Sequence, residues 1–225
     1  MPNRLLAGFL IAIASLVHSH PGGLDKQGGH TDRTSDQYHC HREPCLTLHR
    51  QQQQAEQEAR QQQRAFSGLY ERRDWPHWLD EDGDCQDTRA EILIATSQVP
   101  VTFTRDDRCT VASGRWHDPY SGETFTIASD LDIDHLVPLR HAHGHGGDGW
   151  KERHRRQFAN DPANLLPVSA SANRSKGAGS PDQWLPDNRD YWCQYGQHWQ
   201  QIKQRYRLLI TPPEQQAIDR LLATC

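Results

Sequence analysis

The stretch of residues 132–177 constrains the fold of this chain more than any other part of the sequence. It opens with DIDHLVPL, in which apolar and acidic residues alternate as in a strand, with Asp132 and Asp134 on one face. It closes with NLLPVSASANRSKG, an apolar run followed by serines that can cap a short helix ending at Gly177. The predicted order is therefore strand, long loop, strand, helix.

Polar groups that suit a hard cation are concentrated in this stretch. His135 follows Asp134 at the end of the first predicted strand, and Asn173 lies on the predicted helix. A carboxylate beside an imidazole, with an amide facing them, forms a half-open site of mainly oxygen ligands. Such a site suits a hard divalent cation.

The motif in this stretch resembles that of the HNH nucleases, which share the ββα-metal fold. The resemblance rests on Asp134-His135-Leu136-Val137-Pro138, Asn164-Leu165 and Asn173-Arg174-Ser175-Lys176. It implies an α+β fold, with a ββα-metal core, surrounding helices and a β-hairpin. It also implies His135 as the general base and Asn164 as the residue that orients the loop or the imidazole. Asp134 and Asn173 are then the metal ligands, and Asp132 supports them or is an extra ligand.

The third motif letter is Asn173 rather than histidine, which favours Mg²⁺ over a histidine-rich zinc site, with Mn²⁺, Zn²⁺ or Ca²⁺ as alternatives. The resemblance implies a metal-dependent endonuclease that hydrolyses phosphodiester bonds of DNA, or of RNA. We expect little sequence specificity, because no predicted helix is suited to base reading. Residues 74–225 are similar to secreted bacterial proteins of the HNH family. The competing functions are a secreted metal-binding protein with an inactive nuclease fold, and a toxin or effector nuclease.

The N-terminus predicts export. Residues 1–19 have Arg4 before an apolar run and small residues before a cleavage position at Ser19, which is typical of a signal peptide. The alternative is a membrane anchor, for which the apolar run is short. Secretion, or a periplasmic location, favours disulfides, and proximity in the sequence suggests the pairs Cys40–Cys45, Cys85–Cys109 and Cys193–Cys225. A zinc site is the rival, but the spacing contains no CxxC pair.

Three parts follow the signal peptide. Residues 20–49 are polar and rich in glycine and histidine, and they resemble the small YHYH module through GGHTDR and Tyr38-His39-Cys40-His41, although Gly29 replaces its usual cysteine. His30, His39 and His41 are either zinc or copper ligands or solvated side chains of a disulfide-clipped loop. Residues 50–66 form a glutamine-rich linker, helical or disordered. Residues 67–225 form the predicted nuclease domain.

The net charge of -4 is unusual for a protein that binds nucleic acid, so a local basic face must supply the binding. A helix over residues 150–158 and the motif helix carry the candidates, which are Arg153, Arg155, Arg156, Arg174 and Lys176. An ordinary solvated helix face is the alternative. The expected partner is nucleic acid, DNA before RNA; the processed chain is expected to be a monomer without a membrane contact.

Two further polar clusters leave alternatives open. His141, His143 and His145 alternate with small residues in a glycine-rich segment, which favours a flexible, partly protonated contact surface over a second metal site. Asp80, Asp82 and Asp84 favour a polar turn over a calcium loop. Around the motif, the sequence predicts helices over 88–97, 198–208 and 212–225, strands at 100–103 and 109–111, and a hairpin turn at 118–122.

Overall fold

The computed structural model describes residues 23–31, 38–62 and 65–225, so the predicted signal peptide lies outside the described residues. The chain divides into two units, residues 1–49 and 50–225. The first unit holds an antiparallel hairpin of β1 (Gly29–Thr31) and β2 (Tyr38–Cys40). Helix α1 (Cys45–Gln61) carries the glutamine-rich segment, so residues 50–61 of the predicted linker are helical.

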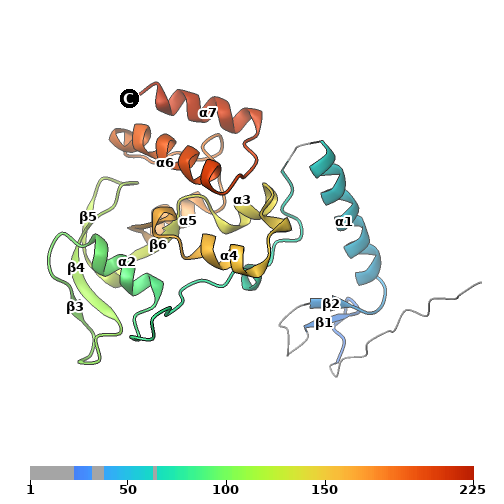
Figure 1. The fold of residues 1–225 in the computed structure, drawn as a ribbon, viewed down its shortest axis with the longest axis horizontal. Helices are drawn as coiled ribbons and strands as arrows, with labels where there is room; N and C mark the ends of the chain where they lie inside the picture. The colour runs from blue at the N-terminus through green and yellow to red at the C-terminus, as the bar shows by residue number, and fades with distance from the viewer. Residues whose placement is uncertain (1–22, 32–37, 63–64) are drawn as a thin grey trace, which may run out of the picture. The chain divides into compact units, whose positions relative to one another are not determined.

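The second unit mixes helices with two small antiparallel sheets, which confirms the predicted α+β class (Figure 1). One sheet has the order β3 (Thr102–Phe103), β4 (Val111–His117) and β5 (Thr124–Ile127). The other pairs β6 (Leu131–His135) with β7 (Leu165–Ser169), and His135 lies opposite Leu165. Helix α5 (Ala170–Lys176) follows β7 directly. The two predicted strands and the helix are therefore present in the predicted order, whereas the connection between the strands is partly helical.

The β6–β7 hairpin lies between two apolar clusters. Leu131 and Ile133 point to one side, where they pack with α2 (Thr88–Thr96) and the buried Trp116. Val168 belongs to the other cluster, which includes residues of α4 (Glu152–Ala159) and of the C-terminal helices. Burial on both sides holds the hairpin rigidly, and residues of alternate parity on β6 then face different surroundings.

The start of α5 is fixed from two directions. The Ser169 side chain accepts a hydrogen bond from the Ala172 amide, which is an N-cap, and Gly177 ends the helix with a φ of 53°. The Ser169 amide donates to Asp118 Oδ2 at 3.0 Å, and Asp118 lies in the turn between β4 and β5. The β4–β5 turn is thereby tied to the beginning of the motif helix.

The segment after Pro138 differs from the prediction of a flexible loop. It forms helix α3 (Leu139–Gly144), because Leu139 and Ala142 are buried in the main apolar cluster. His141, His143 and His145 are buried too, and burial lowers the pKa of each imidazole. These side chains are therefore neutral interior groups, and the predicted partly protonated contact surface is wrong.

The C-terminal helices α6 (Trp192–Arg205) and α7 (Pro212–Leu222) pack side by side (Figure 1). Helix α6 begins six residues before the predicted start, and a Cβ at its Gly196 would lie 2.8 Å from Leu221 Cβ, so glycine permits the close approach. The disulfides are Cys40–Cys45, Cys85–Cys109 and Cys193–Cys225, the same pairs that the sequence suggests. Within the described residues, none of the helices has the length and apolar content needed to cross a membrane.

Candidate active site

A cleft of about 300 Å³ lies beside β6 and α5. Asp134, His135 and Asn173 line it, so the structure brings together three of the four residues predicted as base, orienting group and metal ligands. The sequence analysis assigned no role to Tyr70, Arg72 or Arg140, which line the same cleft.

His135 is held as a neutral imidazole with one nitrogen available. Its Nε2 lies 2.8 Å from the Ala159 carbonyl oxygen. Because a carbonyl only accepts, Nε2 carries the proton and Nδ1 keeps its lone pair. Burial lowers the pKa of His135 to about 3, and the positive charge of Arg72 contributes to the lowering. The side chain is thus in the form that can accept a proton.

Asp134 is a buried carboxylate with two protein partners. Tyr120 donates its hydroxyl to Oδ2 at 2.7 Å, and Lys176 Nζ lies 2.7 Å from Oδ2 and 3.0 Å from Oδ1. Burial raises the pKa of Asp134, whereas Lys176 and the Tyr120 hydroxyl oppose the rise. A carboxylate offers about four lone-pair sites, so these contacts leave capacity for a further cation.

Lys176 is not on the surface, which corrects its prediction as a contact to nucleic acid. It is 3% exposed, and Nζ also donates to the His135 carbonyl oxygen at 2.9 Å. The reason is helical spacing, since residues three apart share a face of a helix. If Asn173 faces β6, then Lys176 faces it too. This signal was present in the sequence.

Asn173 is oriented by Asp132. Its Nδ2 donates to Asp132 Oδ2 at 3.0 Å, so the amide oxygen is left free of this contact. Asp134 and Asn173 line one cleft, and Asp132 is hydrogen-bonded to Asn173. Oxygen donors of this kind fit a hard divalent cation such as Mg²⁺.

Asn164 contacts the backbone after His135, not the imidazole. Its Oδ1 accepts from the Val137 amide at 2.9 Å, and its Nδ2 donates to the Val137 carbonyl at 3.2 Å. Its own carbonyl accepts from the Leu136 amide at 2.8 Å. The side chain is fully buried. Asn164 therefore holds the chain where β6 turns away from the cleft.

The arginines predicted to form a basic face fall into two groups in the structure, one with partners in the chain and one exposed to solvent. Arg155 donates to the Asp148 carbonyl, and Arg156 forms two hydrogen bonds with Glu81, at 2.9 and 2.6 Å, so both have intramolecular partners. Arg153 and Arg174 are exposed, as predicted for phosphate contacts.

The two arginines of the cleft complete the site. Arg72 lies in a 3-10 turn (Arg72–Asp74) and Arg140 lies on α3, and both are exposed. Among the described residues, neither is within ion-pair distance of a carboxylate. The position of Arg140, two residues after Pro138, could have indicated from the sequence that it lies near the motif. Arg72 is far from the motif in sequence, and only the fold brings it to the cleft.

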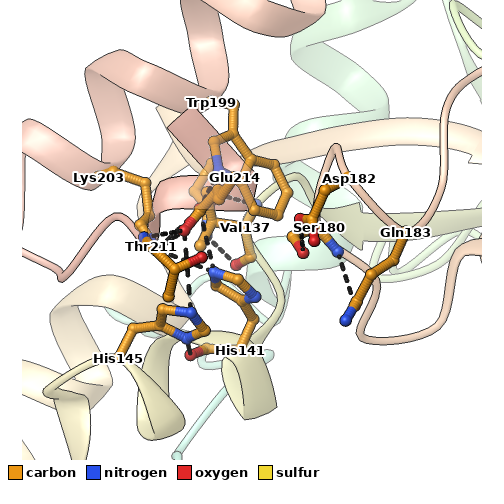
Figure 2. A network of polar contacts seen from close by, with 11 residues as sticks. Val137, His141, His145, Ser180, Asp182, Gln183, Trp199, Lys203, Thr211 and Glu214 are labelled. Atoms are coloured by element: carbon orange, nitrogen blue, oxygen red, sulfur yellow. Dashed lines mark hydrogen bonds and ion pairs between the residues drawn. The ribbon is translucent and has the colours of Figure 1, made fainter. Parts of the chain in front are cut away.

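A second polar group lies inside the unit (Figure 2). Ligand atoms of His141, His145 and Glu214 lie within 4.8 Å of one another, so these side chains could hold a metal ion. The ammonium of Lys203 lies among them, with Nζ 2.8 Å from His141 Nε2 and 2.9 Å from Glu214 Oε1. Trp199 Nε1 donates to the same carboxylate at 2.7 Å. The group joins α3, α6 and α7 through one internal cation.

Electrostatics in this second group follow from burial and pairing. Burial lowers the pKa of His141 to about 3 and of His145 to about 4, so both are neutral at pH 7. Burial alone would raise the pKa of Glu214, but hydrogen bonding to His141 and the charge of Lys203 outweigh it and hold that pKa well below its usual range. Glu214 is thus ionised, and Lys203 neutralises it.

The aspartates predicted to form a polar turn are exposed. Asp80 accepts from the amides of Gly83 and Cys85, and Asp84 accepts from the amide of Gln86. Carboxylate oxygens of Asp80, Asp82 and Asp84 lie close together, as in many exposed acidic loops. The backbone hydrogen bonds account for this loop without an ion.

Comparisons with known proteins find a family and a relative for this chain. Residues 87–218 match the family described as GmrSD restriction endonucleases, C-terminal domain. The chain is 38% identical over 158 residues to an "Uncharacterized secreted protein" of Arthroderma benhamiae, which covers 69% of this chain and 76% of that protein. No solved structure matches the chain. The family match contains β6, β7, α5 and both polar groups, whereas Arg72 lies before it.

Proposed function

Because this chain belongs to the family of GmrSD restriction endonuclease C-terminal domains, we propose that it is a secreted, metal-dependent endonuclease for DNA, with RNA as the second substrate. The observation that carries the proposal is the cleft in which Asp134, His135 and Asn173 meet. The three disulfides and the secreted fungal relative support a location outside the cytoplasm. The ββα order of β6, β7 and α5 supports the resemblance to HNH nucleases.

His135 acts as the general base. Its Nδ1 accepts a proton from the attacking water, while the Nε2 hydrogen bond to Ala159 keeps the ring in place. Asn164 fixes the backbone next to it, which preserves the direction of the imidazole. The base is therefore positioned before substrate binds.

Asp134 and Asn173 would hold a divalent cation, which would supply positive charge to the scissile phosphate and to the leaving oxygen. Asp132 turns the Asn173 amide so that its oxygen is free for the cation, and Lys176 and Tyr120 keep Asp134 in place. Because Asp134 is the charged ligand, its loss should be more harmful than that of Asn173.

Arg72 and Arg140 bind phosphates of the substrate at the cleft, and the exposed Arg153 and Arg174 extend this contact. Replacing Arg72 or Arg140 with alanine should weaken DNA binding and reduce the slope of log affinity against log salt by roughly one unit each. Arg220→Ala, an exposed change on α7 outside the cleft, is the matched control. If the slope of log affinity against log salt is the same for all three variants, neither Arg72 nor Arg140 binds a phosphate.

The central experiment compares His135→Ala with Asn173→Ala in a cleavage assay on duplex DNA, single-stranded DNA and RNA, with a titration of Mg²⁺ and Mn²⁺. Loss of the base should reduce cleavage by about 10²–10⁴-fold at every metal concentration. Loss of a neutral ligand weakens metal binding, so added metal should partly restore the Asn173 variant. His117→Ala changes an exposed histidine of β4 and is the control.

Two results would contradict the assignment. Near-full activity of His135→Ala, or its recovery on adding metal, would mean that His135 is not the base. A wild-type protein that binds metal and nucleic acid but cuts neither DNA nor RNA with any divalent ion would instead be an inactive member of the family.

A further inference from the structure

The histidine-rich hairpin of the first unit brings two of its three motif histidines, His30 and His41, into contact. In the β1–β2 pairing, His30 lies opposite His39, so their side chains share a face of the hairpin. His41 follows β2 two residues after His39, and alternation along the strand puts it on the same face. The hairpin thereby brings together His30 and His41, which are 11 residues apart in the sequence.

The contact between His30 and His41 has the dimensions of a metal-binding pair. Their Nε2 atoms face each other at 3.2 Å, with the two rings nearly perpendicular. Two ligands of a tetrahedral zinc ion at 2.0–2.1 Å lie about 3.3 Å apart. His30 is 7% exposed, and its Nδ1 has no hydrogen-bond partner within the described residues.

The backbone around the pair is preorganised. The Gly28 carbonyl accepts from the amides of both His41 and Arg42 at 2.9 Å, which brings the end of β2 against the start of β1. Gly28 has a φ of 90°, and a Cβ there would lie 2.7 Å from the Arg42 carbonyl oxygen, so the position requires glycine. The Cys40–Cys45 disulfide closes the chain next to His41. These restraints hold the two imidazoles in place without help from an ion.

We propose that this hairpin is a binding site for one divalent zinc- or copper-type ion, held by Nε2 of His30 and Nε2 of His41. Imidazole ligands without a carboxylate suit Zn²⁺ and Cu²⁺ and disfavour Mg²⁺. Both cysteines of the hairpin are in a disulfide, so thiolates take no part. The site is separate from the proposed nuclease cleft and does not depend on it.

The test measures metal binding by the purified secreted protein, stripped with chelator and kept in excess Mg²⁺. Isothermal titration with Zn²⁺, and separately with Cu²⁺, should show a site that weakens by roughly 10²-fold or more in His30→Ala and in His41→Ala, since even outer groups around a metal contribute 10–100-fold. His49→Ala, an exposed histidine in α1, is the matched control and should bind as the wild type does. DNA cleavage should be the same in all four proteins.

A second measurement uses Cu²⁺ as a spectroscopic probe of the site. Electron paramagnetic resonance of the wild type with one equivalent of Cu²⁺ should show coupling to at least two imidazole nitrogens, and this coupling should change in Gly28→Ala, which displaces the pair. Equal Zn²⁺ affinity in the wild type and His30→Ala, or a Cu²⁺ spectrum without imidazole coupling, would overturn the proposal. In that case the contact is a hydrogen bond between the two imidazoles. Failure of nuclease activity would leave this result unaffected.

Discussion

Replacing Lys203 with methionine should destabilise the second unit strongly. Methionine keeps most of the aliphatic stem but removes the ammonium, which is fully buried and lies 2.9 Å from Glu214 Oε1. Glu214 would keep its hydrogen bonds from Trp199 and the Thr211 amide but lose the cation that neutralises it. The consequence is an uncompensated charge in the interior.

The expected cost is about 3–5 kcal/mol, which is the usual cost of removing one partner of a buried ion pair. Each 1 kcal/mol shifts the melting temperature of a domain of this size by about 2–4 °C, so Tm should fall by roughly 6–20 °C. The double variant Lys203→Met with Glu214→Gln should recover much of this, because neither partner is then charged. Burial lowers the pKa of Lys203 to about 8, which shows that the charged ammonium is itself costly to bury. The double variant also removes this cost.

The assay is urea and thermal unfolding followed by tryptophan fluorescence, with Trp199 in the network as a local probe. Lys151→Met, an exposed lysine before α4, should change the free energy of unfolding by no more than about 0.5 kcal/mol. A loss below about 1 kcal/mol for Lys203→Met, or a double variant no more stable than the single one, would refute the ion-pair account. A large rise of the wild-type Tm on adding Zn²⁺, absent in Glu214→Gln, would show that this group binds metal instead.

Two further predictions concern pH and the first unit. The pKa values of His141 and His145, lowered to about 3 and about 4, lie below the value of 6.5 in the unfolded chain, so the unfolded state binds more protons between these limits. The stability that they contribute is complete above pH 6.5 and falls by about 1.4 kcal/mol per pH unit for each histidine on acidification, which urea unfolding at several pH values checks; a slope unchanged in His141→Gln would contradict it. A chain without residues 1–49 should fold and cleave DNA like the whole protein, because the cleft lies entirely in the second unit; a folded but inactive shorter chain would show that the two units depend on each other.

The elements of the candidate site could be predicted because their signals are local. Alternation over β6 indicates a strand, the Ser169 cap and Gly177 mark the ends of α5, and both features involve residues close in sequence. The expected roles of His135 as base and of Asn173 as oxygen ligand come from the resemblance of their motif to that of the HNH nucleases. Disulfide pairing by proximity follows the same local logic.

Burial decided the features that the sequence left open or that were predicted wrongly. The segment around His141 contains glycine and histidine, which are typical of a mobile loop, yet apolar residues between them pack into the core and form α3. Composition averages over such a segment and cannot show that two of its residues find a partner surface on distant helices. The protonation state of the histidines then follows from that burial.

The sequence by itself determined the chemistry that the cleft can contain: an imidazole, a carboxylate and an amide on a strand and a helix. The tertiary structure decided which charges meet there. Lys176 pairs with Asp134 across 42 residues, and Tyr120 reaches the same carboxylate from the β4–β5 turn. Arg72 enters the cleft from a turn far upstream. Such pairings depend on how the elements pack, because electrostatic and hydrogen-bond partners are set by distance and burial rather than by position along the chain.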